Sequence, residues 1–267
     1  MGHLNFNFAE LAPMQRYKLL CGLVVPRPIA LVTSISPAGV VNAAPFSFFK
    51  VFSEHPALIV LGLQHNPDGS PKDTTRNVHA SGEFVVNLVD EGIAEAMTLT
   101  ATDFPPGEGE PRALGMATLP STLVQPPRLA ATPAAFECRR TVSLAFGPQR
   151  ELLVGEVLGA QVREGIVDPL SLNVDFAALA PVGRLCGAAY ARQRDRFELK
   201  QSATPSGKPG ARTFQARRGA HANCTAPIAI TTAACVGSST VMPSAASSGA
   251  RCLAMPAQPM MTTSAPS

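Results

Sequence analysis

Apolar runs separated by turn residues dominate most of the chain. Residues 29–35 are β-branched and apolar, and residues 57–63 form an apolar run that begins just after Pro56. A short continuous apolar run bounded by turn residues predicts a buried strand. Residues 37–39, Pro-Ala-Gly, have the composition of a turn, so the flanking segments 29–35 and 40–44 are expected to form a hairpin.

Later apolar segments predict a β-rich domain with few helices. Further strands are expected over 83–89, 135–144, 152–162 and 182–190, with Gly147-Pro148 at the turn between the middle two. One short helix is expected to have Asp73 as its N-cap and Gly82 just past its end. A second helix is expected over 93–98, whereas 103–115 is rich in Pro, Gly and Glu and predicts a surface loop. Many strands with few short helices indicate a single barrel-like β domain.

Composition divides the chain near residue 200. Residues 201–267 contain five basic and no acidic residues, which leaves 17 basic and 19 acidic residues in 1–200. This tail consists mostly of Ala, Ser, Thr, Pro and Gly and cannot bury enough apolar surface to offset its ordering entropy. We therefore expect a folded domain over 1–200 and a disordered, low-complexity tail over 201–267, whose composition is compatible with a non-native C-terminus.

Composition also excludes several classes of protein. The first 200 residues carry a net charge of −2, which argues against nucleic-acid binding, and no apolar run approaches the roughly 20 residues of a membrane-spanning helix. No basic segment followed by an apolar core stands at the N-terminus, so a cytoplasmic protein is expected. The six cysteines show no zinc-ligand spacing, and Cys21, Cys138 and Cys186 are expected to be small core residues. No metal site is predicted.

Common catalytic motifs are missing from the sequence, with one exception. Neither a glycine-rich dinucleotide loop nor a P-loop is present. Ser47-Phe48-Phe49-Lys50 matches the Ser-x-x-Lys pattern of penicillin-recognising acyl enzymes, although the companion motifs of that class are missing. A Ser-Lys acyl enzyme that uses Ser47 and Lys50 is therefore kept as a remote alternative.

A group of polar residues lies among the predicted strands and turns. It comprises Thr33, Ser34, Asn42, Ser47, Lys72, Thr74 and Asn77. Hydroxyls, a lysine and a helix N-terminus are the groups that bind a phosphate monoester. The alternative is that these side chains only satisfy backbone groups at element ends and that Lys72 is solvated. Composition favours the alternative, whereas the order of the segments favours a phosphate site.

Four ordered segments carry a resemblance to a known family. They are 26–34 (PRPIALVTS), 41–49 (VNAAPFSFF), 69–77 (GSPKDTTRN) and 82–88 (GEFVVNL), and 181–185 with Tyr190 resembles the closing segment. In this order they resemble the flavin reductase-like family of FMN-binding split barrels, in particular its flavoredoxin-type branch. The resemblance covers about residues 10–200. It implies a six-stranded split β-barrel with Greek-key topology, assembled as a homodimer with FMN near the subunit interface.

The resemblance also implies roles for individual residues. Thr33, Ser34, Lys72 and Thr74 would hold the FMN phosphate, with Asn77 beside them; Asn42, Ala43, Ala44 and Ser47 would line the isoalloxazine, Phe48 or Phe49 would pack beside it, and Arg27 would reach the phosphate or the flavin edge. The phenylalanines could equally be core residues. No catalytic residue is assigned.

Two functions follow from the resemblance. The first is an NADH- or NADPH-dependent flavin reductase that passes electrons through bound FMN to free flavin, a partner monooxygenase or another acceptor. The second is a flavin-binding electron carrier without nicotinamide oxidation. Several family reductases have a histidine near the flavin on a late strand, but residues 150–190 contain none. Hydride transfer to flavin requires no protein acid, so both functions remain open.

Overall fold

The computed structural model describes residues 2–105 and 107–199. The chain divides into two units, residues 1–201 and 202–267. The tail over 201–267, which was predicted to be disordered, lies outside the described residues.

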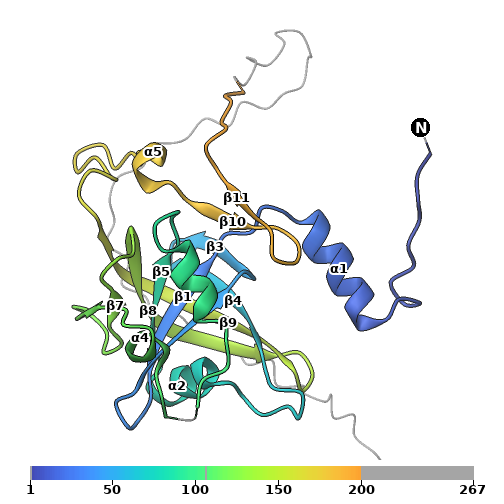
Figure 1. The fold of residues 1–267 in the computed structure, drawn as a ribbon, viewed down its shortest axis with the longest axis horizontal. Helices are drawn as coiled ribbons and strands as arrows, with labels where there is room; N and C mark the ends of the chain where they lie inside the picture. Colours follow the sequence, from blue (N-terminus) through green and yellow to red (C-terminus); the bar gives the residue numbers. More distant parts are fainter. Residues whose placement is uncertain (1, 106, 200–267) are drawn as a thin grey trace, which may run out of the picture. The chain divides into compact units, whose positions relative to one another are not determined.

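One antiparallel sheet of seven strands forms the core of the first unit (Figure 1). Its strands, in spatial order, are β2 (Val41–Phe46), β1 (Ala30–Ile35), β5 (Glu83–Leu88), β8 (Ala134–Ala145), β9 (Arg150–Val162), β4 (Ala57–Gln64) and β3 (Phe49–Glu54). The predicted hairpin is confirmed, with Thr33 opposite Ala43. The fold is mainly β, as expected.

The sheet curls because the chain joins its two outermost strands. β2 and β3 lie at opposite ends of the strand order, yet only Ser47 and Phe48 separate them. At this junction the Gly62 N–H of β4 donates to the Phe48 carbonyl at 2.7 Å. A Cβ on Gly62 would lie 2.9 Å from the Phe48 Cβ, so glycine permits this close approach. The predicted count of six strands is not confirmed, because the sheet has seven, with β2 and β3 as separate strands.

Irregular pairings and a second glycine help the long strands to bend. The β8–β9 register shifts between Glu137 and Cys138 and again between Arg140 and Val142. Such bulges increase local twist and bend a strand. On β9 a Cβ at Gly155 would overlap the Phe84 ring, so this position lets the ring fill the interior of the curled sheet.

The interior of the curled sheet is a single apolar cluster. It contains Ala30, Val32, Phe49, Ile59, Leu61, Leu63, Val78, Phe84, Val86, Cys138 and Leu153. Val78 comes from helix α2 (Asp73–Ser81), which therefore packs against the strands that form this core. Phe49, one of the two phenylalanines that were candidates for the flavin site, is 8% exposed and belongs to this core.

β1 is buried on both faces, which explains why residues 29–32, which lead into it and form its first half, are all apolar. Leu31 of β1 and Ile29, just before the strand, pack in a second cluster with Ile93, the N-cap of helix α3 (Ala94–Leu99), and with Met97 of that helix. A strand covered on both sides gains from apolar residues at every position.

The remaining elements show where the sequence patterns misled. The expected strand over 182–190 is a hairpin of β10 (Val182–Arg184) and β11 (Tyr190–Arg192), because Cys186 to Ala189 turn the chain. Missed elements are α1 (Pro13–Leu23), β3, β6 (Thr118–Leu119), β7 (Arg128–Leu129), α4 (Glu110–Ala113) within the predicted loop, and α5 (Phe176–Leu179). No helix among the described residues is long and apolar enough to cross a membrane.

The three cysteines of the first unit differ in environment. Cys21 and Cys138 are buried, as predicted, and burial raises the pKa of Cys138 to about 12. Cys186 is exposed in the turn between β10 and β11, so the prediction that it is a core residue is wrong.

Candidate functional site

A cavity of about 440 Å³ opens beside β2 and the first turn of α2. Its walls come from segments far apart in the sequence. They include residues 42 and 44–48 of β2 and the following turn, residues 72–76 at the start of α2, residues 100–104, Glu110 of α4, and Arg150 and Arg184. Its volume falls within the range of about 300 to 1,000 Å³ that is typical of small-molecule sites.

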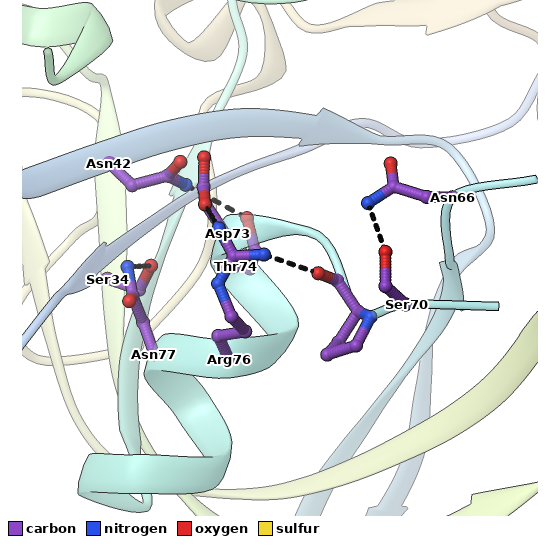
Figure 2. A network of polar contacts seen from close by, with 9 residues as sticks. Ser34, Asn42, Asn66, Ser70, Asp73, Thr74, Arg76 and Asn77 are labelled. Carbon is purple, nitrogen blue, oxygen red and sulfur yellow. Dashed lines mark hydrogen bonds and ion pairs between the residues drawn. The ribbon is translucent and has the colours of Figure 1, made fainter. Parts of the chain in front are cut away.

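The first turn of α2 has no side-chain cap. Lys72 occupies the N-cap position in extended conformation and makes no capping hydrogen bond. Asp73, predicted as the cap, is instead the first helical residue, and its carboxylate pairs with Arg76 (Figure 2). Because the first N–H groups of a helix have no partners within the helix, this end offers donors and partial positive charge to the cavity. The opposite end matches the prediction, since Gly82 has a φ of 74°.

Buried amides tie α2 to the sheet. Asn42 of β2 hydrogen-bonds the Thr74 hydroxyl at 2.9 Å, and Asn77 donates to the Ser34 hydroxyl at 3.1 Å (Figure 2). All four side chains are buried. These contacts fix the position of the helix N-terminus relative to β1 and β2.

Six of the twelve predicted site residues line the cavity. They are Asn42, Ala44, Ser47, Phe48, Lys72 and Thr74. These residues come from β2, its turn and α2, so the structure brings together the second and third of the sequence segments that carried the family resemblance.

The other predicted residues lie behind the cavity wall. Thr33 is fully buried and donates to the Pro127 carbonyl at 2.5 Å, and Ser34 and Asn77 hydrogen-bond each other. Ala43 packs in the second apolar cluster, and Phe49 in the barrel core. None of these five, nor Arg27, is among the residues that line the cavity. The Thr33 and Ser34 hydroxyls are therefore not placed to contact a phosphate in this cavity.

Arg27 is buried next to the site and hydrogen-bonds to several separate segments of the chain. Its guanidinium donates to the carbonyls of Cys21 and Val24 at the end of α1 and to that of Leu185 at 2.7 Å. Its Nε also lies 3.4 Å from the Ser47 hydroxyl. Arg27 thus holds the turn that carries Ser47, and its side chain does not line the cavity.

Sequence reasoning missed the two arginines of the cavity wall. The Arg184 guanidinium lies 4.8 Å from the Tyr190 ring centroid and donates to the Tyr190 hydroxyl at 2.5 Å. The Arg150 guanidinium lies 5.9 Å from the Phe48 ring centroid. Arg184 stands in the closing segment noted in the sequence, but Arg150 begins β9, a strand that was predicted without any sign of a binding role.

Glu110 was also missed, because the segment around it was predicted to be a loop. One carboxylate oxygen, Oε2, accepts the Ala43 N–H at 2.8 Å. With the Asn42 amide oriented so that its donors meet acceptors, Asn42 donates to the other oxygen, Oε1, at 3.2 Å. Burial raises the pKa of Glu110 above its ordinary value, although the Ala43 N–H opposes this effect.

The geometry offers no support for the Ser-Lys alternative. Among the described residues, the Ser47 hydroxyl has Arg27 as its hydrogen-bond partner, while Lys50 is exposed on β3. A nucleophilic serine needs a base within hydrogen-bond reach, and arginine stays protonated.

Comparison with known proteins identifies the family. A family model described as "Flavin reductase like domain" matches residues 22–180. An uncharacterized protein of Deinococcus radiodurans is 42% identical over 205 residues, which cover 74% of this chain and 90% of that protein.

Two solved structures are similar in both sequence and fold. One is the 2-nitrobenzoate 2-nitroreductase of Pseudomonas fluorescens, with 39% identity, a TM-score of 0.69, and coverage of 78% of this chain and 100% of the other. Nitrilotriacetate monooxygenase component B of Bacillus cereus has 33% identity, a TM-score of 0.72, and coverage of 74% and 100%. These neighbours support an oxidoreductase with a split-barrel fold. Because the family model matches more than half of the chain, the protein belongs to the flavin reductase-like family.

Proposed function

We propose that the chain binds FMN non-covalently in the cavity and acts as an NADH- or NADPH-dependent flavin reductase. The observation that carries the proposal is the first turn of α2, which has no side-chain cap and forms part of the cavity wall beside Lys72. A helix N-terminus next to a lysine is a favourable site for a phosphate group. Lys72, Thr74 and the first N–H groups of α2 would hold the FMN phosphate.

The remaining cavity residues suit a flat, partly polar ring. Asn42, Ala44 and Ser47 would line the isoalloxazine along β2, and Phe48 would pack beside it. Thr33, Ser34, Ala43 and Asn77 would support this wall from behind, and Arg27 would position Ser47.

Bound FMN would supply the redox chemistry, namely two-electron reduction by a nicotinamide hydride and transfer of those electrons to an acceptor. The protein's own residues bind and orient the reactants: the α2 terminus fixes the phosphate end, and β2 fixes the ring. Arg184 and Arg150 place two positive charges on the cavity wall, which would attract the phosphates of a nicotinamide cofactor. The acceptor we propose is free flavin, a partner monooxygenase or a small oxidant such as a nitroaromatic compound, by analogy with the two similar structures.

Anaerobic reduction of the purified protein tests this function. The protein, loaded with FMN, should lose its absorbance near the flavin maximum when NADH or NADPH is added. Bleaching only by dithionite would instead identify an electron carrier without nicotinamide oxidation. A protein that retains no flavin after incubation with FMN would contradict the whole proposal.

We also propose that the functional form is a homodimer. Large apolar side chains are exposed on β3 and at the end of α1, among them Val51 and Phe52 at 70% and Leu23 at 78%. Grouped exposed apolar residues are typical of protein–protein interfaces. Light scattering at micromolar concentration should give twice the chain mass of 27.9 kDa; a monomer that still holds flavin would exclude the dimer.

A further inference from the structure

We propose that Glu110 is a specificity residue that binds the ribityl hydroxyls of the flavin. This inference rests on the function proposed above, because it assigns a further contact within the same cavity. It concerns the chain of atoms that links the phosphate, at α2, to the ring, along β2.

Hydrogen bonds place Glu110 between these two parts of the cavity. Its Oε2 accepts the N–H of Ala43 on β2 at 2.8 Å. Its Oε1 is 3.2 Å from the amide of Asn42, which in turn contacts the Thr74 hydroxyl in the first turn of α2 at 2.9 Å. Glu110 is therefore one side chain away from the proposed phosphate site and in direct contact with the strand that would line the ring.

The carboxylate has acceptor capacity to spare. A carboxylate offers about four lone-pair sites, and the two hydrogen bonds just described occupy only part of them. Among residues 2–105 and 107–199, no lysine, arginine or histidine forms an ion pair with Glu110. It also lines the cavity. Hydroxyl donors are the neutral groups that such a carboxylate binds best, as acidic residues do with ribose hydroxyls in dinucleotide sites.

The backbone of α4 holds Glu110 in place. Gly109 lies so close to the edge of β2 that an added Cβ would overlap the Val41 carbonyl. β2 is the last strand in the spatial order of the sheet, so N–H groups along its outer edge have no strand partner. Glu110 accepts the N–H of Ala43, and Pro45, two residues further on, has no N–H that would need a partner. The close approach fixes the residue before Glu110 against the strand and directs the next one toward Ala43.

A purely structural role is the competing explanation, in which Glu110 only caps the free edge of β2. The two explanations differ in how they depend on the ligand. Loss of a ribityl contact weakens only flavins that have a ribityl chain, whereas distortion of β2 weakens every flavin.

Fluorescence titration of the apoprotein with lumiflavin, riboflavin and FMN separates these explanations, since lumiflavin lacks the ribityl chain. Glu110→Ala should weaken riboflavin and FMN by about 10-fold each and leave lumiflavin unchanged. Glu110→Gln, which preserves shape, should show the same ligand pattern with a smaller loss and serves if the alanine variant does not fold. Glu95→Ala, which removes an exposed carboxylate from α3, should bind all three ligands like the wild type.

Equal losses for lumiflavin and riboflavin, or no loss for either, would overturn the assignment of Glu110. Failure of the proposed function would look different, because the wild-type protein itself would then bind none of the three flavins.

Discussion

Two glutamates of this domain, Glu137 and Glu110, differ in how many hydrogen-bond donors they have and in the direction of their pKa shifts. Glu137 of β8 is fully buried and accepts the N–H groups of Thr122, at 2.9 Å, and of Leu123, together with the Gln161 amide. Burial acts to raise the pKa of Glu137, but these hydrogen bonds together lower it below its ordinary value. At Glu110 burial prevails and the pKa is raised.

The difference separates a structural carboxylate from one suited to binding. The donors around Glu137 come from a surface loop and a neighbouring strand, so the charge fastens the loop to the sheet. Glu110 has fewer donors and faces a cavity. When every oxygen of a buried carboxylate accepts hydrogen bonds from the protein, those bonds stabilise its ionised form. A carboxylate with free acceptor sites can instead accept hydrogen bonds from a ligand.

The largest difference between the two glutamates is expected in the loss of unfolding free energy when each is replaced by alanine. Glu137→Ala should lower the free energy of unfolding by about 3 kcal/mol, because it removes several hydrogen bonds to a fully buried carboxylate at once. Glu110→Ala should cost only about 1 kcal/mol, since it frees fewer donors beside a solvent-accessible cavity. Urea denaturation of both variants measures this; equal costs would end the distinction.

The pH dependence of stability should differ in sign between the two sites. The folded-state pKa of Glu137 is lowered, so its contribution is present above the ordinary value of 4.5 and is lost as the pH falls through the folded pKa. The pKa of Glu110 is raised, so the folded protein holds that proton more tightly and loses stability as the pH rises from 4.5 through the folded pKa.

Glutamine variants isolate these two contributions. Relative to wild type, Glu137→Gln should flatten the unfolding free energy on the acid side of pH 4.5, and Glu110→Gln should flatten it on the other side. Urea denaturation over a pH series would reveal this pattern, and parallel curves for all three proteins would refute it.

Deletion of residues 201–267 should have the smallest effect, because the tail sequence is poor in core-forming residues and the family model ends at residue 180. Thermal stability and FMN occupancy of the shortened chain should match those of the full chain. A marked fall in flavin occupancy would show that the tail contributes to the site.

The sequence predicted the fold where apolar runs were long and punctuated by clear turns. β1, β4 and β5 were visible for this reason, as was the end of α2 at Gly82. β3 was missed because it is not a buried apolar run: after Phe49 most of its residues are exposed, Val51 and Phe52 among them. The closure of the sheet depends on long-range pairing that no local pattern encodes.

The site was predictable only in part, for the same reason. Lys72, Thr74 and Asn42 stood in segments whose order resembled a family. Glu110, Arg150 and Arg184 enter the cavity through tertiary packing, and Thr33 and Ser34 have the right chemistry but point into structural hydrogen bonds. Residue type suggests a role, and only the partners of the side chain decide it.

The central claim is that the first turn of α2 and Lys72 bind the phosphate of FMN. Fluorescence titration of apoprotein with FMN and riboflavin, in wild type and Lys72→Ala, tests it most directly. A charge-assisted contact of about 1.5–3 kcal/mol predicts that Lys72→Ala weakens FMN by roughly 10-fold to 100-fold and leaves riboflavin, which has no phosphate, nearly unchanged. Unchanged FMN affinity, or an equal loss for riboflavin, would contradict the claim.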